Sequence, residues 1–270
     1  MLDLTKTTLI IPIKIEHRDR YRNAEVVLNF LNSNFQTNVF IFEVSETGET
    51  SLDFAKDLKY LNIKHWCIKN EPFFHRTKYL NIMLDKVETP VVVNYDIDVI
   101  LSPENFMECQ DDILNGKHKV IYPYELGNGQ IMVLGTFDYY GFKESGYSMS
   151  FIDTSTQKVE HTAECGHCIF FNRDEYRKWG GENEDFISYG PEDKERMIRF
   201  QKITKSVIWK PGKKVYHFEH HRGSDSNMSN IHFEKNWEIY RNLEKMKEEE
   251  LISYYRNQVY KKKYSTFQYF

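Results

Sequence analysis

Residues 91–99 read Val-Val-Val-Asn-Tyr-Asp-Ile-Asp-Val and directly follow Pro90. A continuous run of β-branched residues is typical of a strand that is buried on both faces of a parallel sheet. In an extended chain, Asp96 and Asp98 point to the same side. Their carboxylates repel each other unless a cation lies between them, and Mg²⁺ and Mn²⁺ prefer such oxygen ligands. The stretch therefore predicts a divalent-metal site for a nucleotide diphosphate, against the commoner alternative of a strand that ends in a polar turn.

Strands and helices alternate along the chain before this stretch. Hydrophobic periodicity predicts strands at Thr7–Lys14, Val39–Val44 and Ile63–Ile68, and helices at 20–34, Ser51–Leu61 and His75–Val87. Such alternation with short turns is typical of a doubly wound, mostly parallel α/β sheet with helices on both faces. Ligands of these sheets bind at the carboxyl ends of the strands, where Asp96 and Asp98 are expected.

The second half of the chain continues the pattern less regularly. It predicts helices at Pro103–Asn115, Arg173–Trp179, Pro191–Ile203 and Ile231–Glu248, and strands at Lys119–Tyr124, Cys165–Asn172, Val207–Trp209 and Lys214–Phe218. Residues 127–150 are rich in glycine and aromatic side chains, and form either a loop or hairpin over a cleft or an ordinary surface excursion. Because no linker divides the sequence, we expect one domain with a C-terminal extension.

The composition disfavours several classes of protein. The 270 residues include 36 basic and 40 acidic side chains, and the net charge of -4 gives no support for a nucleic-acid partner. Residues 1–13 do not resemble a signal peptide, and no apolar run reaches about 18 residues, so a cytoplasmic location is expected. Four cysteines do not make a disulfide framework. An aromatic content of 15% suits clefts that stack flat ligands or sugar rings.

Two acids, Glu192 and Asp193, follow Gly190-Pro191 in the first turn of a predicted helix. The helix dipole favours acids at this position, which is the simpler explanation. The functional explanation is a general base beside a substrate-binding carboxylate, because adjacent residues point in different directions. The residues alone leave both explanations open.

Residues 216–222 read Tyr-His-Phe-Glu-His-His-Arg and are dense in imidazole. In a strand, His217 and His221 share one face and His220 lies opposite. Imidazole can complete the coordination of Mn²⁺ that a carboxylate begins, and Arg222 can bind phosphate through its planar fork. The alternative is a polar strand edge.

The segment Cys165-Gly166-His167-Cys168 has the spacing of a dithiol redox motif. Such a motif opens a helix after a strand, whereas Ile169 and Phe170 continue a strand here. A zinc site needs a second pair of ligands, and the two other cysteines in the sequence are isolated. We expect the small residues of this segment to line a cleft instead.

Taken in order, these motifs resemble those of the GT-A nucleotide-sugar glycosyltransferases over residues 7–222. More narrowly, they are similar to the inverting β-1,4-galactosyltransferase group and its bacterial capsule and lipopolysaccharide relatives. The matching segments are Ile11-Pro12-Ile13 with Arg18, then Glu43 or Glu46, Phe74–Asn81, Asp96-Ile97-Asp98, Tyr189–Asp193 and His217. The segment 74–81 has His75 where the family has Asn, and Tyr189–Asp193 departs from Trp-Gly-Gly-Glu-Asp by Tyr for Trp and Pro for Gly. His220 is a rival for the metal-ligand position of His217.

The resemblance implies a metal-dependent transferase. Such an enzyme would move a hexose or N-acetylhexosamine from a UDP-sugar to a hydroxyl of a saccharide acceptor, with inversion, in bacterial surface polysaccharide synthesis. The family roles fall on Asp98 and His217 with Asp96 as ligands of Mn²⁺ or Mg²⁺, on Pro12, Ile13, Arg18, Glu43, Arg76, Lys78 and Asp96 for donor binding, on Asp193 as the base, and on Glu192 as the residue that orients the acceptor. Residues 1–230 would be the catalytic domain, with a nucleotide-binding half (1–100) and an acceptor half (101–230).

Three alternatives accompany this interpretation. One is a retaining enzyme of the same fold, and another is a non-catalytic nucleotide- or carbohydrate-binding relative, which the presence of both Asp98 and Asp193 disfavours. The third is a metal-dependent nucleotidyltransferase. That class typically has a glycine-rich phosphate loop after the first strand, and residues 16–20 contain no glycine.

The C-terminal segment 231–270 is predicted to be a charged helix followed by a basic, aromatic tail. Residues 251–270 contain no acid but have four basic and seven aromatic side chains. Such a mixture suits an anionic membrane surface, where lipid-linked acceptors reside, and would place the protein at the inner face of the membrane. Packing of the tail on the domain or on a homodimer partner is an equal alternative.

Overall fold

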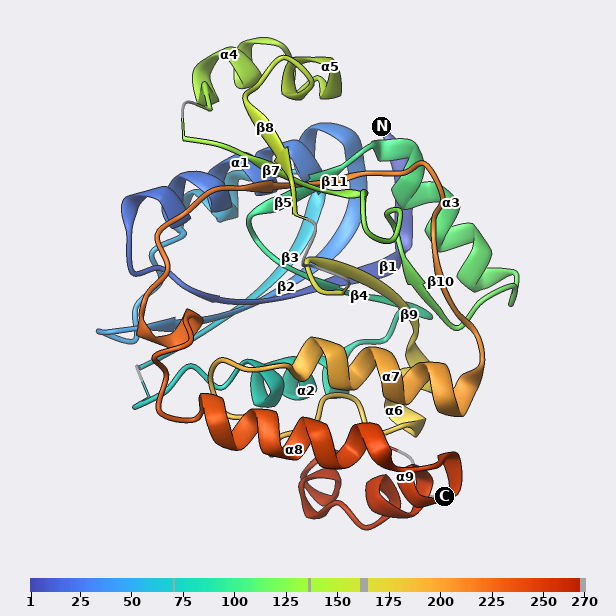
Figure 1. Ribbon diagram of the computed structural model, residues 1–270. Helices are drawn as coiled ribbons and strands as arrows, with labels where there is room; N and C mark the ends of the chain where they lie inside the picture. Colours follow the sequence, from blue (N-terminus) through green and yellow to red (C-terminus); the bar gives the residue numbers. More distant parts are fainter. Residues whose placement is uncertain (70, 136, 161–164, 268–270) are drawn as a thin grey trace.

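The computed structural model describes residues 1–69, 71–135, 137–160 and 165–267. Its main sheet contains β1 (Leu2–Lys14), β2 (Phe35–Ser45), β3 (Leu61–Lys69), β4 (Val91–Tyr95), β6 (Val120–Tyr122), β9 (Cys168–Asn172) and β10 (Val207–Trp209). These strands lie in the order β10-β6-β9-β4-β1-β2-β3 (Figure 1). Strand β9 runs antiparallel to both neighbours, and the other pairs are parallel. The carboxyl ends of β1, β2 and β4 therefore meet at one edge, which is where ligands bind in such sheets.

A smaller sheet adjoins this edge. It contains β5 (Val99–Leu101), β11 (Val215–Phe218), β7 (Gln130–Val133) and β8 (Gln157–Val159) in that order. The chain leaves the main sheet at Tyr95 and enters the smaller sheet at Val99, so Asp96 and Asp98 lie in the turn between them. Strand β11 contains His217 and pairs with β5. This pairing brings the turn and the histidine-rich segment together.

Helices cover both faces of the main sheet, which confirms the predicted architecture (Figure 1). Helices α2 (Arg76–Lys86), α6 (Arg173–Lys178) and α7 (Glu192–Thr204) pack on one face, and α1 (Arg18–Asn34) and α3 (Pro103–Leu114) pack on the other. The sequence of α1 explains its placement, because Ala24, Val27, Leu28 and Leu31 recur with helical spacing and are all buried.

Two predicted elements differ from the structure in more than the position of their ends. The helix expected at Ser51–Leu61 is only a short 3-10 helix, η1 (Asp53–Asp57), in which Ala55 alone is buried, so little apolar surface supports a longer helix. The strand expected over 91–99 is divided between two sheets. Asp96 and Asp98 therefore do not have the side-by-side arrangement of an extended chain.

Residues 127–150 include β7, α4 (Tyr139–Glu144) and the start of α5 (Met149–Ile152). Helix α4 packs on α1, where Phe142 is buried and stacks on Phe30 with ring centroids 6.5 Å apart. The aromatic side chains attach the end of this segment to α1, whereas β7 belongs to the smaller sheet, so the choice between a loop over a cleft and a surface excursion stays open.

The C-terminal segment packs on the domain. Helices α8 (Phe233–Lys245) and α9 (Glu248–Arg256) lie against α7 and are followed by η3 (Val259–Lys263) (Figure 1). Tyr260, Tyr264 and Phe267 are buried in the main core, and the Tyr260 hydroxyl donates to the carbonyl of Gly180 at 2.8 Å. These rings are therefore not available to a membrane surface.

Three further expectations concern the tail, membrane-spanning helices and the domain boundary. Tyr269 and Phe270 of the predicted tail lie outside the described residues. Within the residues that are described, no helix is both long and apolar enough to cross a bilayer. The division of the chain at residue 230 stays a prediction.

Candidate functional site

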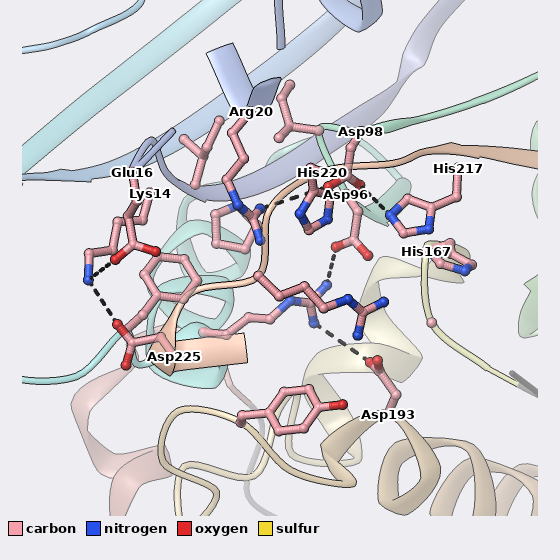
Figure 2. Close-up of a pocket in the computed structure, with 18 of the residues that line it drawn as sticks. Lys14, Glu16, Arg20, Asp96, Asp98, His167, Asp193, His217, His220 and Asp225 are labelled. Atoms are coloured by element: carbon pink, nitrogen blue, oxygen red, sulfur yellow. Dashed lines mark hydrogen bonds and ion pairs between the residues drawn. The ribbon is translucent and has the colours of Figure 1, made fainter. Parts of the chain in front are cut away.

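A cavity of about 410 Å³ opens where the two sheets meet, at the carboxyl ends of β1 and β4 (Figure 2). Its lining includes Pro12, Ile13, Lys14, Glu16, Arg20, Phe74, Arg76, Asp96, Asp98, Glu160, Cys165, Gly166, His167, Tyr189, Asp193, His217, His220, Arg222 and Asp225. Acids, cations and imidazoles make up most of this lining, so the cavity suits a polar and charged ligand. It lies at the sheet edge where the sequence predicts a ligand site.

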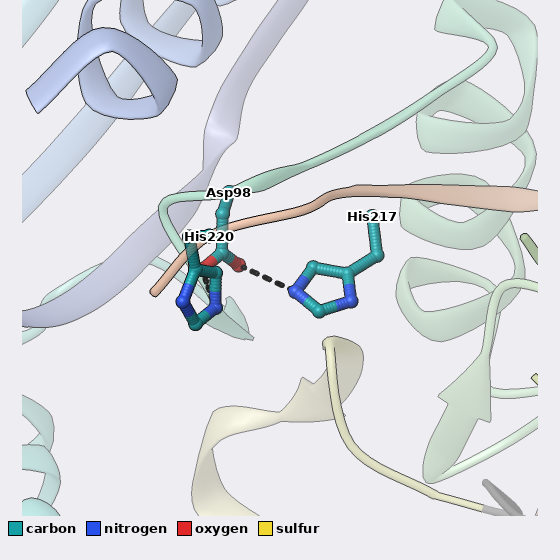
Figure 3. A group of neighbouring side chains, drawn as sticks. All are labelled: Asp98, His217 and His220. Carbon is teal, nitrogen blue, oxygen red and sulfur yellow. Dashed lines mark ion pairs between the residues drawn. The ribbon is translucent and has the colours of Figure 1, made fainter. Parts of the chain in front are cut away.

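Asp98, His217 and His220 form the group that is best placed to hold a cation (Figure 3). The Nε2 atom of His220 lies 3.0 Å from one oxygen of Asp98, and Nε2 of His217 lies 3.8 Å from the other. One carboxylate and two imidazoles fit Mn²⁺ and other transition metals better than Mg²⁺, which prefers oxygen ligands. The donor set thus fits the predicted metal, with both rival histidines included.

The histidine-rich segment reaches this arrangement by a route that the sequence did not predict. The expectation that His220 lies opposite His217 is wrong, because β11 ends at Phe218 and the chain beyond it is no longer a strand. His220 then turns toward Asp98, while the backbone N–H of His221 donates to Asp19 at 2.5 Å.

Asp98 is ionised in this environment. Burial raises the pKa of its carboxyl group, but the neighbouring His217, His220 and Arg20 side chains outweigh that effect and hold the pKa well below its usual value. The pKa of His220 is raised, because its contact with Asp98 exceeds the opposing effect of burial. Arg20 lies 3.8 Å from the oxygen of Asp98 that His220 also contacts, and it adds a positive charge there.

Asp96, the other predicted ligand, is engaged elsewhere. Its carboxylate accepts a hydrogen bond from Nη2 of Arg76 at 2.5 Å. Nη1 of Arg76 lies 3.6 Å from Asp193, so this guanidinium group lies between two acids (Figure 2). The turn at residues 96–98 explains the separation, because it directs the two aspartates to different partners. Direct coordination of a cation by Asp96 stays a prediction.

Asp193 lines the cavity from the first turn of α7 and is supported by a buried ion pair. Arg196 donates to Asp193, and its Nη1 also donates to both oxygens of Glu182 at 2.8 and 2.7 Å. Burial raises the pKa of Asp193, but Arg196 and Arg76 outweigh it and hold the pKa below its usual value. Asp193 is therefore an ionised carboxylate that faces the cavity.

Glu192 is buried beside Asp193 but is not among the residues that line the cavity. One of its oxygens has no hydrogen-bond partner among the described residues. Burial and the charge of Asp193 raise the pKa of Glu192 to about 8, which favours the uncharged form of this side chain. Its predicted contact with the acceptor stays a prediction, and this geometry does not support it.

The raised pKa of Glu192 has a measurable effect on stability. A carboxyl group whose pKa is higher in the folded protein stabilises the fold below its unfolded pKa of 4.5, and that contribution is lost as the pH rises to about 8. We expect Glu192→Gln, which cannot ionise, to gain stability relative to wild type across this range and to keep the gain above it. Urea unfolding at several pH values measures this, with exposed Glu234→Gln as control. Parallel pH profiles for wild type and Glu192→Gln would contradict it.

The predicted donor-binding residues divide into two groups. Pro12, Ile13, Arg76 and Asp96 line the cavity, whereas Arg18, Glu43 and Lys78 do not. Arg18 lines a separate surface pocket, Glu43 accepts from the Ser51 backbone at 2.8 Å and contacts His65 at 2.9 Å, and Lys78 pairs with Glu71 at 2.8 Å. The motif match located these residue types, but the side chains of Glu43 and Lys78 are paired with local partners outside the cavity.

Sequence reasoning also missed residues that the structure brings to the cavity. Lys14 pairs with Glu16 at 2.7 Å and with Asp225 of η2 (Ser224–Ser226) at 2.8 Å. Glu160 and His167 meet on the opposite side of the cavity. Lys14 was detectable as the last residue of the first strand, but Glu160 belongs to no motif. The prediction that the segment 165–168 lines a cleft agrees with the positions of Cys165, Gly166 and His167.

Comparisons with known proteins define the class of fold. No protein-family model matches this chain, and no curated protein matches it by sequence. Among solved structures, it is similar to residues 1–349 of S. aureus TarS, with 13% identity, a TM-score of 0.57, and coverage of 92% of this chain and 68% of that one. The same TarS fragment in complex with UDP-GlcNAc matches with 14% identity, a TM-score of 0.56, and coverage of 92% and 70%.

A third similar structure is GalNAc-T7 with UDP, GalNAc and Mn²⁺, with 11% identity and a TM-score of 0.57. The match covers 94% of this chain but only 52% of GalNAc-T7, so this chain spans about half of that protein. At such low identities, likeness establishes the fold. This chain has the GT-A fold of nucleotide-sugar glycosyltransferases, as its sequence motifs led us to expect.

Proposed function

We propose that this protein is a metal-dependent glycosyltransferase that moves a sugar from a UDP-sugar to a hydroxyl group of a saccharide acceptor. The observation that carries the proposal is the placement of Asp98, His217 and His220 opposite Asp193 in one cavity at the ligand-binding edge of the sheet. The UDP-GlcNAc of the TarS complex and the UDP and Mn²⁺ of the GalNAc-T7 structure support the choice of donor and metal. The sugar would be a hexose or an N-acetylhexosamine.

Several groups in the cavity would have a role in this reaction. Asp98, His217 and His220 would hold Mn²⁺, which when bound offsets the charge of the departing diphosphate. Arg20 and Arg76 lie beside the two aspartates of the turn and offer guanidinium groups to phosphate oxygens.

Asp193 would act as the general base. It accepts the proton of the acceptor hydroxyl as that oxygen bonds to the anomeric carbon and the bond to the diphosphate breaks, so UDP leaves as an anion. A single displacement of this kind inverts the anomeric configuration. Anomeric analysis of the product distinguishes it from a retaining reaction. A role in bacterial surface polysaccharide synthesis, on a free or lipid-linked saccharide, stays a prediction.

A binding experiment tests the metal and nucleotide parts of the proposal together. We expect Asp98→Ala to weaken UDP binding in the presence of Mn²⁺ by about tenfold or more, because the site would lose a ligand of the cation that would offset the charge of the diphosphate. Without Mn²⁺, the two proteins should bind UDP equally. Calorimetry measures both, and Asp112→Ala on α3, which pairs with Lys210 away from the cavity, is the matched control. Equal UDP affinities of Asp98→Ala and wild type in Mn²⁺ would remove the metal from the proposal.

The transfer reaction itself is tested by a donor screen. We would incubate the protein with Mn²⁺ and a panel of nucleotide sugars and measure release of the nucleotide by slow hydrolysis. Release from a UDP-sugar but not from GDP- or CMP-sugars is the expected result. Absence of release from every donor would favour the non-catalytic alternative.

A further inference from the structure

The carboxylate of Glu160 lies between two imidazole rings of the cavity. One of its oxygens is 2.9 Å from Nε2 of His167, and the other is 3.3 Å from Nδ1 of His217. The side chain of Glu160 is only 11% exposed, and the two rings lie side by side with centroids 4.7 Å apart (Figure 2). Both oxygens of this acid are therefore used, and neither points into open solvent.

The ring of His217 has one nitrogen facing each of two acids. Its Nδ1 faces Glu160, and its Nε2 lies 3.8 Å from Asp98 (Figure 3). A carboxylate that accepts the N–H of Nδ1 leaves the lone pair of a neutral imidazole on Nε2. Histidines that ligate metals commonly have such a carboxylate behind them, which fixes both the tautomer and the orientation of the ring.

The contact with His167 keeps Glu160 in this position. His167 has a φ of +57°, in the left-handed region that residues other than glycine seldom adopt, so its backbone is held by its surroundings. Its carbonyl accepts the N–H of Asp96 at 2.8 Å, which attaches His167 to the turn that contains Asp98. Glu160 is thus linked to this turn through His167 and to β11 through His217.

We propose that Glu160 is a positioning residue, which holds His217 with Nε2 toward Asp98 so that a divalent transition-metal ion binds between Asp98, His217 and His220. The inference rests on the metal site of the proposed function and deepens it. The alternative is that Glu160, His167 and Nδ1 of His217 bind a second cation themselves. The experiment below distinguishes the two possibilities.

The test is a thermodynamic cycle in which Mn²⁺ alone is the probe. Calorimetry measures Mn²⁺ binding to the full chain as wild type, Glu160→Ala, His217→Ala and the double variant. Loss of the outer carboxylate should weaken binding by about 10- to 100-fold. In the His217→Ala background, Glu160→Ala should change affinity by less than about twofold, because its effect passes through that ring. Asp153→Ala, which removes the carboxylate that accepts from the Tyr216 hydroxyl at 2.9 Å, should leave binding unchanged.

Melting temperatures without metal show whether Glu160→Ala is folded. If it is not, Glu160→Gln replaces it, because the amide keeps one acceptor oxygen and the shape of the side chain. The absorption spectrum of bound Co²⁺ gives a second measure, since a reoriented imidazole changes the ligand field. Expected support is weaker Mn²⁺ binding together with an altered Co²⁺ spectrum.

Three results would overturn the proposal. The first is an Mn²⁺ affinity of Glu160→Ala within about twofold of wild type. The second is an equal loss of Mn²⁺ affinity when Glu160→Ala is made in the wild-type and in the His217→Ala backgrounds. The third is binding of two Mn²⁺ ions per chain by wild type and of one by Glu160→Ala. In each of these cases wild type still binds Mn²⁺, so the metal site of the proposed function stands. If wild type binds no Mn²⁺, both proposals fail.

Discussion

Asp193→Asn is expected to lower the rate of sugar transfer by about 10²- to 10⁴-fold while changing donor affinity by less than about twofold. The amide keeps the size and position of the carboxylate but cannot accept the proton of the acceptor hydroxyl. Donor binding should persist, because the groups proposed for the diphosphate lie at Asp98, Arg20 and Arg76, on other elements of the cavity. Initial rates with the donor found in the screen, together with UDP calorimetry in Mn²⁺, measure the two effects separately.

The matched control is Asp112→Asn, the same chemical change in a carboxylate of α3 that pairs with Lys210 at 2.5 Å and Lys117 at 2.7 Å. It should transfer sugar at the wild-type rate. Near-normal turnover of the Asp193→Asn variant would exclude Asp193 as the base. Loss of UDP binding by the same variant would instead make Asp193 a donor-binding residue.

Arg196→Met is expected to destabilise the protein by about 3–5 kcal/mol. Arg196 and Glu182 are each only 1% exposed, so removal of the guanidinium group leaves the charge of Glu182 buried without its main partner. The loss should shrink in the double variant Arg196→Met/Glu182→Leu, in which no uncompensated charge remains. Urea unfolding at pH 7 gives the free energies.

The comparison for this prediction is Lys213→Met, which breaks the surface pair between Lys213 and Glu108 at 2.8 Å. Pairs of this kind contribute about 0–1 kcal/mol. A loss for Arg196→Met as small as that of Lys213→Met would mean that Glu182 reaches solvent or another partner when the arginine is removed.

The architecture was predictable because its strongest patterns are local. The Val and Ile runs of β1 and β4 and the helical spacing in α1 each lie within a short stretch of sequence. The errors fall where a partner is distant. The start of β1 was missed because Leu2–Leu4 pair with β2 beyond a break in register. The division of residues 91–99 was missed because it depends on where β11 lies.

In the candidate site, too, residues in local motifs were predicted and those with distant partners were missed. Asp98, Asp193 and His217 stand in short motifs and were predicted, whereas Glu160 belongs to no motif and meets His217 from 57 positions away. Glu43 shows the limit of transferring a residue from a family pattern. The residue type matches, but its carboxylate contacts His65 of the neighbouring strand and not the cavity.

The packing of the C-terminal segment has a consequence for the candidate site. Gly181 has a φ of +57°, and a Cβ atom there would come within 2.9 Å of the ring of Phe267. The next residue, Glu182, is the acid that holds Arg196 against Asp193. A side chain at position 181 would therefore push against Phe267 and shift the backbone next to Glu182, so this glycine links the packing of the C-terminal segment to the support of Asp193, the proposed base.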